Sequence, residues 1–241
     1  ATARAHETFL TFSQTNMQEM QTQMSALVTA AAQETEKNTG SQNHPETVPP
    51  VFTRDQCLEF ATGRAGKVLG PAFAVIDTYP VRVRLPDEPL MLVDRIMAIE
   101  GTPCSLGPGK IITQHDVLPR AWYLDGGVAP VSICIEAGQA DLFLCAWLGI
   151  DHMVKGRRRY RLLDAKVTFH RALPRPGETI TYHISIDRFL RQGDVYLFFF
   201  HYQGFIGSQL FISMRDGCAG FFTEEEVEHS GGIVLKKQDR A

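Results

Sequence analysis

The pattern of apolar and polar positions divides the chain into a helical start, a polar link and a longer region rich in strands. Residues 4–34 place apolar side chains mostly three or four positions apart and contain no proline or glycine, which predicts an amphipathic helix. Residues 35–50 are polar and aperiodic and contain proline and glycine. We therefore expect a linker or docking helix over 1–34, a flexible linker over 35–50, a folded domain over 51–232 and a tail over 233–241.

Within the folded domain, helix and strand signals come in a definite order. A capping box at Thr53 and Gln56 predicts a short helix that ends near Gly63. Six segments favour strands: 89–101, 108–114, 165–169, 179–189, 195–205 and 209–218. Between the second and third lies an apolar stretch, Val131 to Leu148, that predicts one long buried helix. This order indicates an α+β fold with an antiparallel sheet wrapped around one long central helix.

The central helix carries three strongly polar side chains, Glu136, Gln139 and Asp141. A buried carboxylate must be paired, neutralised or used chemically, because burying an isolated charge is costly. Glu136 and Gln139 are three positions apart and share a helix face, whereas Asp141 is turned away. Glu136 is therefore either a structural carboxylate or a general acid, with Gln139 orienting the substrate at a cleft near the helix N-terminus.

The segment Asp125-Gly126-Gly127 directly precedes this helix. A turn explains an aspartate followed by two glycines. Alternatively, its backbone amides and the positive end of the helix dipole hold a thioester carbonyl.

Histidine is the natural general base near neutral pH, so the histidines of the domain are candidates for that role. His115, beside Asp116 at a strand end, is expected at the surface, and a structural role is expected for the others: His152 in a loop, and His170, His183 and His201 on strands. No Cys or His pair has metal-ligand spacing, so no metal site is expected.

The dense basic segment 155–161 contains Lys155, Arg157, Arg158, Arg159 and Arg161. It is interpreted as a solvated loop or as a docking surface for an acidic partner. A single aromatic within it and a net charge of −3 for the chain argue against a nucleic-acid partner.

Composition narrows the setting further. Five cysteines without a CxxC pair indicate reduced thiols and a cytoplasmic protein. No apolar run approaches the ~20 residues of a membrane span, and the first residues lack the apolar core of a signal peptide. The missing initiator methionine suggests a piece of a longer protein. No nucleotide-binding or serine-hydrolase motif occurs.

Several ordered motifs carry a family resemblance over roughly residues 51 to 230: PLMLVDRI, AWYLDGG, EAGQADLFL, LGID, RLLDAKVTFHRALPRPGETI and DGCAGFFTEEE. Together they resemble a dehydratase domain of the polyunsaturated fatty acid synthases and related iterative polyketide synthases. These domains belong to the 3-hydroxydecanoyl-acyl-carrier-protein dehydratase branch of the hotdog superfamily. The N-terminal helix resembles the linker that precedes such domains.

The resemblance implies a hotdog fold that pairs as a homodimer or as a pseudo-dimer with a second hotdog, beside other synthase domains. It implies dehydration of 3-hydroxyacyl thioesters carried on the phosphopantetheine of an acyl carrier protein, with no other cofactor. A histidine of one half removes the α-proton, and a helix carboxylate of the other protonates the departing hydroxyl. Candidate catalytic residues are then Glu136, Gln139 and Asp125, and candidate substrate-binding residues are Trp122, Tyr123, Gly126 and Gly127. The basic segment becomes the candidate docking site for the acidic carrier protein.

The sequence departs from the family pattern in two places. No histidine occurs at Asp125 to Val128, where the family has its base, and Glu136 precedes Gln139 by three positions instead of four. We therefore interpret the chain as the half of a double hotdog that lacks histidine and supplies the carboxylate. Two alternatives stay open: a pseudo-dehydratase that binds or scaffolds an acyl chain, and a hotdog thioesterase that uses Glu136 and a water.

Overall fold

The computed structural model describes residues 49–230, and its compact unit runs from Val48 to His229. The predicted N-terminal helix, nearly all of the predicted linker and the predicted tail lie outside the described residues.

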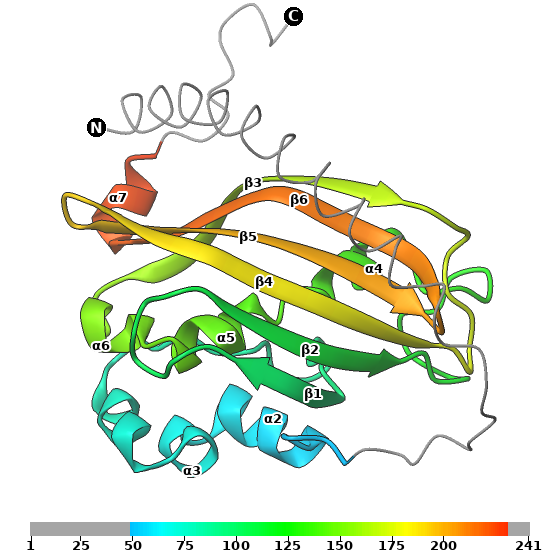
Figure 1. Cartoon of the computed structure of the whole chain (residues 1–241), viewed down its shortest axis with the longest axis horizontal. Coiled ribbons are helices and arrows are strands. Elements are labelled where there is room, and N and C mark those ends of the chain that lie inside the picture. Colours follow the sequence, from blue (N-terminus) through cyan, green and yellow to red (C-terminus); the bar gives the residue numbers. More distant parts are fainter. Residues whose placement is uncertain (1–48, 231–241) are drawn as a thin grey trace, which may run out of the picture. The chain divides into compact units, whose positions relative to one another are not determined.

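Six antiparallel strands form one sheet in the described part of the chain (Figure 1). They are β1 (Arg95–Glu100), β2 (Gly109–Asp116), β3 (Arg159–Phe169), β4 (Thr179–Gln192), β5 (Val195–Ile206) and β6 (Gln209–Phe222). Their order across the sheet is β1-β2-β4-β5-β6-β3, so β3 lies at one edge. All six predicted strand segments are present, although β1 is shorter than predicted and β3 is longer. The α+β hotdog expectation is confirmed.

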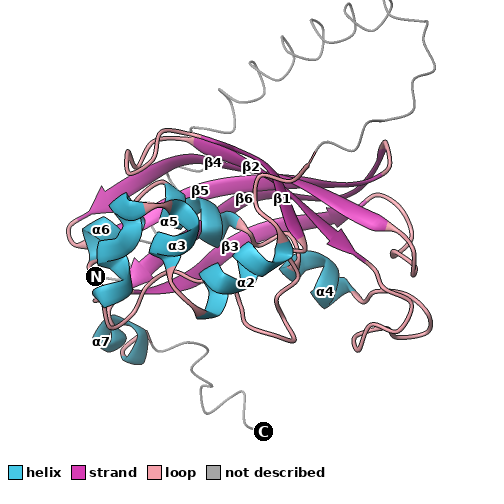
Figure 2. Cartoon of the chain, turned by 90° about the horizontal axis from the view of Figure 1, so that it is seen from below, coloured by secondary structure: helices cyan, strands magenta, loops and turns pink. Residues whose placement is uncertain are grey.

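Helices gather on one face of this sheet (Figure 2). They are α2 (Arg54–Thr62), α3 (Ala65–Leu69), the 3₁₀ segment η2 (Pro71–Thr78), α4 (Val131–Glu136), α5 (Asp141–Trp147) and α6 (Ile150–Val154), while α7 (Glu224–Glu228) follows β6. The predicted capping box at the start of α2 is present. The ring of Phe143 on α5 is completely buried and lies 5.1 Å from the ring of Phe52 and 4.6 Å from that of Phe60. These contacts join α5 to α2 and to the short segment that precedes α2.

The central helix is not continuous, which corrects the prediction of one long helix over Val131 to Leu148. It is divided into α4 and α5, and residues 137–140 form turns instead. Gly138 lies against the rings of Tyr182 and Tyr202, and a Cβ atom at this position would be 2.8 Å from Cζ of Tyr202. Only glycine permits this approach, and glycine also weakens a helix. The break therefore follows from packing against the sheet, which an apolar pattern does not reveal.

The run Phe198-Phe199-Phe200 lies on β5, between β4 and β6. Phe198 and Phe200 are buried, while Phe199 is half-buried beneath the guanidinium of Arg188. The strand is central, as its apolar run indicates, but only one face is fully covered: on the face of Phe199, His201 and Gln203 are exposed.

Candidate functional site

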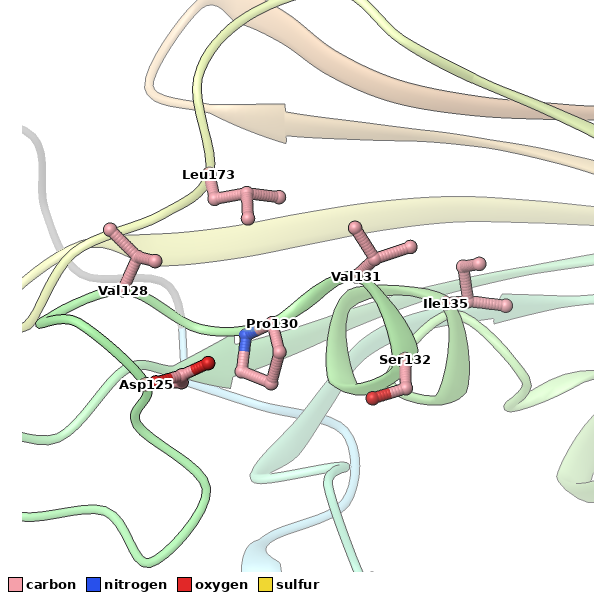
Figure 3. Close-up of a pocket in the computed structure, with 7 residues that line it drawn as sticks. All are labelled: Asp125, Val128, Pro130, Val131, Ser132, Ile135 and Leu173. Atoms are coloured by element: carbon pink, nitrogen blue, oxygen red, sulfur yellow. The ribbon is translucent and has the colours of Figure 1, made fainter.

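Two adjoining hollows lie beside the start of α4, and Pro130 and Ser132 line both of them. The larger has a volume of about 630 Å³ and is shown in Figure 3; its walls are Asp125, Val128, Pro130, Val131, Ser132, Ile135 and Leu173. The smaller has a volume of about 380 Å³; its walls are Leu90, Trp122, Tyr123, Pro130, Ser132, Ile133 and Glu136. These volumes are in the range of small-molecule sites, and both walls are mostly apolar.

Glu136 is the carboxylate of the smaller hollow, at the last position of α4. Its side chain is half-buried, and burial raises the pKa of this carboxyl above its ordinary value. A carboxyl group with a raised pKa keeps its proton closer to neutrality and can donate it. Its place in the hollow and its raised pKa make Glu136 the candidate proton donor of this site.

Gln139 does not continue the helix face of Glu136, because α4 ends at Glu136. It lies in the interruption, where its backbone N–H donates to the carbonyl of Glu136 over 2.9 Å. The inference that the two side chains share a helix face was therefore wrong. Gln139 also does not line either hollow.

Asp125, Gly126 and Gly127 form a tight turn, as the simpler of the two interpretations predicted. The backbone of Asp125 pairs with that of Val128 in both directions, at 3.0 and 3.1 Å. Gly126 and Gly127 have φ values of +55° and +77°, as this type of two-residue turn requires. The Asp125 side chain reaches the larger hollow (Figure 3), so the structure does not bring it together with Glu136.

Trp122 and Tyr123 both line the smaller hollow with Glu136. Trp122 is 60% exposed, yet its indole N–H donates to the carbonyl of Pro89 over 3.1 Å. The ring of Tyr123 is buried and meets that of Trp122 edge-on at 5.7 Å. The structure thus brings three of the predicted site residues to one hollow.

A buried hydrogen-bonded chain, unforeseen from the sequence, runs behind this wall. The Tyr123 hydroxyl lies 2.8 Å from Nε2 of His115, and Nδ1 of His115 lies 3.1 Å from a carboxylate oxygen of Asp94. That oxygen also accepts the backbone N–H of Asp116 over 2.8 Å, and the other accepts from Arg54 over 2.8 Å. His115 is only 4% exposed, so its predicted surface position was wrong.

The hydrogen-bonded chain from Asp94 through His115 to Tyr123 has a defined direction of donors and acceptors. Burial would raise the pKa of Asp94, but the hydrogen bonds from His115 and the Asp116 amide lower it overall, which keeps the carboxylate charged. We assign the ring proton of His115 to Nδ1, which then donates a hydrogen bond to the Asp94 carboxylate and leaves Nε2 as the acceptor for the Tyr123 O–H. Burial and the nearby charge of Asp94 raise the pKa of Tyr123 to about 12, so the phenol keeps its proton.

A signal for His115 was present in the sequence. On β2 the positions Ile111, Thr113 and His115 alternate with more exposed ones, and all three are buried. Period-two counting from Ile111 places His115 on the inner face. The adjacent Asp116 is not the carboxylate that contacts the His115 ring. That carboxylate belongs to Asp94, 21 positions earlier.

Asp141 is completely buried at the start of α5, and neither carboxylate oxygen has a hydrogen-bond partner. Burial, with a smaller contribution from the negative charge of Glu136 when ionised, raises the pKa of this carboxyl to about 7, although the nearby backbone amides of Asp141 and Leu142 act in the opposite direction. The hydroxyls of Tyr160 and Tyr202 are buried without partners as well, and Asp141 raises the pKa of both. Asp141 therefore faces the sheet side of the central helix.

The four other candidate histidines of the sequence analysis each contact a neighbouring side chain, and the ring of His183 on β4 lies 5.3 Å from that of Phe205. His152 lies in α6 rather than in a loop, against the ring of Phe73. His170 follows the end of β3, and its Nε2 lies 2.8 Å from Oγ of Ser213. His201 lies 3.2 Å from Asp187, whose hydrogen bond raises the pKa of His201.

The basic segment is only partly a loop, because β3 begins at Arg159. Arg158 points inward and donates to Glu226 on α7 over 2.9 Å and to the carbonyl of Phe221 over 3.3 Å. Arg159 lies 4.0 Å from Glu224. Lys155, Arg157 and Arg161 are exposed and remain the candidates for contact with an acidic partner.

Within residues 49–230, no three His, Cys, Asp or Glu side chains come together in a manner suited to a metal ion. In the same part of the chain, every helix is too short or too polar to cross a lipid bilayer.

Comparison with known proteins now defines the family. The FabA-like domain model matches residues 85–215, which include both hollows, the central helix and most of the sheet. The chain belongs to the FabA-like domain family. It is also 40% identical, over 194 residues, to one of the subunits of the polyunsaturated fatty acid synthase of Thraustochytrium sp.. That match covers 79% of this chain and only 13% of the relative, so the chain spans a small part of the curated relative that it matches.

Two solved structures show weaker likenesses. The dehydratase heterocomplex ApeI:P from Xenorhabdus doucetiae is 13% identical with a TM-score of 0.42, over 65% of this chain and 97% of that one. The E. coli PaaI protein from the phenylacetic acid degradation operon is 14% identical with a TM-score of 0.35, over 50% of this chain and 81% of that one.

Proposed function

We propose that this FabA-like domain is the carboxylate half of a dehydratase in a polyunsaturated fatty acid or polyketide synthase. Its substrate is a 3-hydroxyacyl thioester on the phosphopantetheine of an acyl carrier protein, and its product is the 2-enoyl thioester. A second hotdog domain supplies the general base. The single observation that carries the proposal is Glu136: a half-buried carboxyl group with a raised pKa, in a mostly apolar hollow beside the central helix.

The chemistry divides between two groups. A histidine of the second hotdog removes the α-proton, and the electron pair of that C–H bond forms the new double bond. The C–O bond at carbon 3 breaks, and neutral Glu136 gives its proton to the departing hydroxyl, which leaves as water. Glu136 suits this step because burial favours its protonated form, and the apolar walls strengthen the developing interaction.

The need for a second hotdog rests on two features of the described residues. No histidine lines either hollow, and His115, the histidine of the hydrogen-bonded chain, is enclosed behind Tyr123. Strand β3 is an edge strand, and its Leu162 and Leu163 side chains are 42% and 54% exposed. Two exposed leucines on an edge strand whose backbone groups are unpaired on one side are suited to contact with another domain, although charged residues flank them on the same strand.

Mass spectrometry of a 3-hydroxyacyl carrier protein tests the proposal. The chain is assayed alone and together with a histidine-bearing hotdog of a polyunsaturated fatty acid synthase. The paired sample is expected to show loss of one water, and Glu136→Gln is expected to slow that loss by about 10²–10⁴-fold. Asp125→Asn is the matched control, because Asp125 lines the other hollow. Full activity of Glu136→Gln in the pair would refute the role of Glu136.

A non-catalytic acyl-binding or scaffolding role is the second candidate, favoured by the absence of histidine from both described hollows. Its signature is tight binding of an acyl carrier protein with no loss of water in either sample. The same spectra reveal a thioesterase as release of the free acid, which Glu136→Gln would abolish.

A further inference from the structure

The Asp94–His115–Tyr123 chain ends on the wall of the hollow that contains Glu136, yet the dehydration step has no use for it. All three residues come from different elements: Asp94 directly precedes β1, His115 lies on β2 and Tyr123 precedes α4. A structural hydroxyl is satisfied by one backbone carbonyl, as the Tyr182 hydroxyl is by that of Cys134 over 2.6 Å. The Tyr123 hydroxyl instead donates to His115, which is held in turn by the charged carboxylate of Asp94. These three residues are called the relay below.

The relay determines what Tyr123 can do toward a ligand. Asp94 accepts from the Asp116 amide and from Arg54. With the ring proton of His115 assigned to Nδ1, which faces Asp94, Nε2 accepts from the Tyr123 hydroxyl. The single proton of Tyr123 is therefore committed to His115. Tyr123 lines the hollow, and a phenol oxygen whose proton is given to His115 has only lone pairs left for a ligand, so it can accept a hydrogen bond but cannot donate one.

Glu136, on the wall of the same hollow, has the opposite character. Burial raises the pKa of its carboxyl group, which favours the protonated form that can donate to an oxygen. A group that fits between a donor and an acceptor must itself both accept and donate. A hydroxyl does both, whereas a ketone oxygen only accepts.

We propose that Tyr123 is a specificity-determining residue that accepts a hydrogen bond from the 3-hydroxyl of the bound acyl chain, and that His115 and Asp94 are positioning residues that fix its polarity. The inference rests on the proposed function, because it assigns a contact to the substrate of the same site. It explains how the hollow would distinguish a 3-hydroxyacyl chain from the 3-oxoacyl chain that differs by two hydrogens. A site built to pair with a hydroxyl rejects an analogue that leaves a buried group unpaired.

Binding, measured without turnover, tests the inference. Calorimetry compares 3-hydroxyacyl and 3-oxoacyl pantetheine analogues in which an amide replaces the thioester. The wild-type chain, paired with its histidine-bearing hotdog, is expected to prefer the hydroxy analogue by about tenfold, the range of one buried hydrogen bond. Tyr123→Phe is expected to remove the preference while leaving affinity for the oxo analogue within about twofold. Tyr182→Phe, a buried hydrogen-bonded tyrosine outside the hollow, is expected to keep the preference.

Equal binding of both analogues by the wild type, or an unchanged preference in Tyr123→Phe, would overturn the inference. A wild type that binds neither analogue would also overturn it. If Tyr123→Phe does not fold, nitrogen NMR of the wild type decides: neutral His115 is expected to carry its proton on Nδ1, and a proton on Nε2 would contradict the relay. Dehydration is measured separately, so an inactive protein that keeps the preference would count against the proposed function alone.

Discussion

Nε2 of His115 lies 2.8 Å from the hydroxyl of Tyr123, and the two side chains belong to residues that are only 4% and 8% exposed. Loss of the Tyr123 hydroxyl would leave a buried ring nitrogen without a partner, and water has little access to replace it. An unsatisfied buried group costs about 1–3 kcal/mol, more than the net value of the hydrogen bond itself. This contact therefore contributes to stability as well as to the wall of the hollow.

We expect Tyr123→Phe to lower the free energy of unfolding by about 1–3 kcal/mol in urea denaturation. The neighbouring Trp122→Phe serves as the control. Trp122 also makes a hydrogen bond, to the carbonyl of Pro89, but it is 60% exposed and water can take its place. A change below about 0.5 kcal/mol is expected there. Equal losses in both variants would show that burial of His115 does not determine the cost.

Much of the fold could be predicted from the sequence because the relevant signals are local. The capping residues Thr53 and Gln56 are three positions apart, and each strand segment is bounded by its own turn residues. The break after Glu136 could not be predicted, because it depends on the rings of Tyr182 and Tyr202, which approach Gly138 from distant strands. An apolar run shows that a helix is buried and does not show where its neighbours force it to break.

The candidate site was partly predictable for the same reason. Glu136 stands out as a carboxylate in an apolar stretch, and Trp122 and Tyr123 belong to a recognisable motif. The Tyr123 hydroxyl contacts His115, and His115 in turn contacts Asp94. The pairing of β1 with β2 brings Asp94 and His115 together. That pairing is long-range information, so the sequence pattern could indicate only that His115 faces inward.

Gly138→Ala is expected to destabilise the domain, because the added methyl group would be 2.8 Å from Cζ of Tyr202 and 3.0 Å from Cε1 of Tyr182. Both rings are completely buried and cannot move aside without disturbing the core. Overpacking of this kind costs about 1–3 kcal/mol. Thermal or urea unfolding measures the loss. Gly107→Ala is the control, since its nearest neighbour is the side chain of Ser105 at 3.1 Å, and a loss there equal to that of Gly138→Ala would refute the packing argument.

We predict that the exposed residues of the basic segment contact the carrier protein, and their role can be tested separately from that of Arg158, which binds within the domain. Replacing Lys155, Arg157 and Arg161 with Glu is expected to weaken binding of an acidic acyl carrier protein at least tenfold at low salt. The wild-type affinity should itself fall as salt screens these exposed charges. Surface plasmon resonance at two ionic strengths measures both effects.

Arg158 provides the contrast within that segment, because it is bound internally to Glu226 and to the Phe221 carbonyl. Arg158→Ala is expected to lower the unfolding temperature while leaving carrier affinity within about twofold, since its guanidinium is not presented to solvent. Unchanged carrier binding in the triple variant would exclude this surface as the docking site.

The edge strand β3 leads to a prediction about association. Leu163→Lys places a charge at a 54% exposed position of this edge, and Leu162 beside it is 42% exposed. Charged residues on an edge strand oppose pairing with another sheet. Analytical ultracentrifugation of the chain alone is expected to show self-association in the wild type and mainly monomer in the variant. Thr168→Lys, which adds the same charge at an exposed and already polar position of β3, is the control, and an equally large effect there would indicate a general charge effect.

Asp141 predicts a dependence of stability on pH with a definite sign. Its pKa is about 7 in the folded protein against an ordinary value of 3.8. Below pH 4 the carboxyl is protonated in both states. Between pH 4 and 7 the unfolded chain loses this proton while the folded chain keeps it, so the contribution of Asp141 to stability falls as pH rises, by about 4 kcal/mol in total, and then stays level.

Asp141→Asn cannot ionise and removes this dependence. The difference in the free energy of unfolding, variant minus wild type, is expected to rise between pH 4.5 and 7.5 and then to level off. Taking the difference cancels the titration of the other groups. Urea denaturation at half-unit intervals of pH measures it. We expect the rise because two carboxylate oxygens without partners in the core favour the protonated form. A difference that stays flat across this range would contradict this expectation and would mean that the buried carboxyl keeps its ordinary pKa.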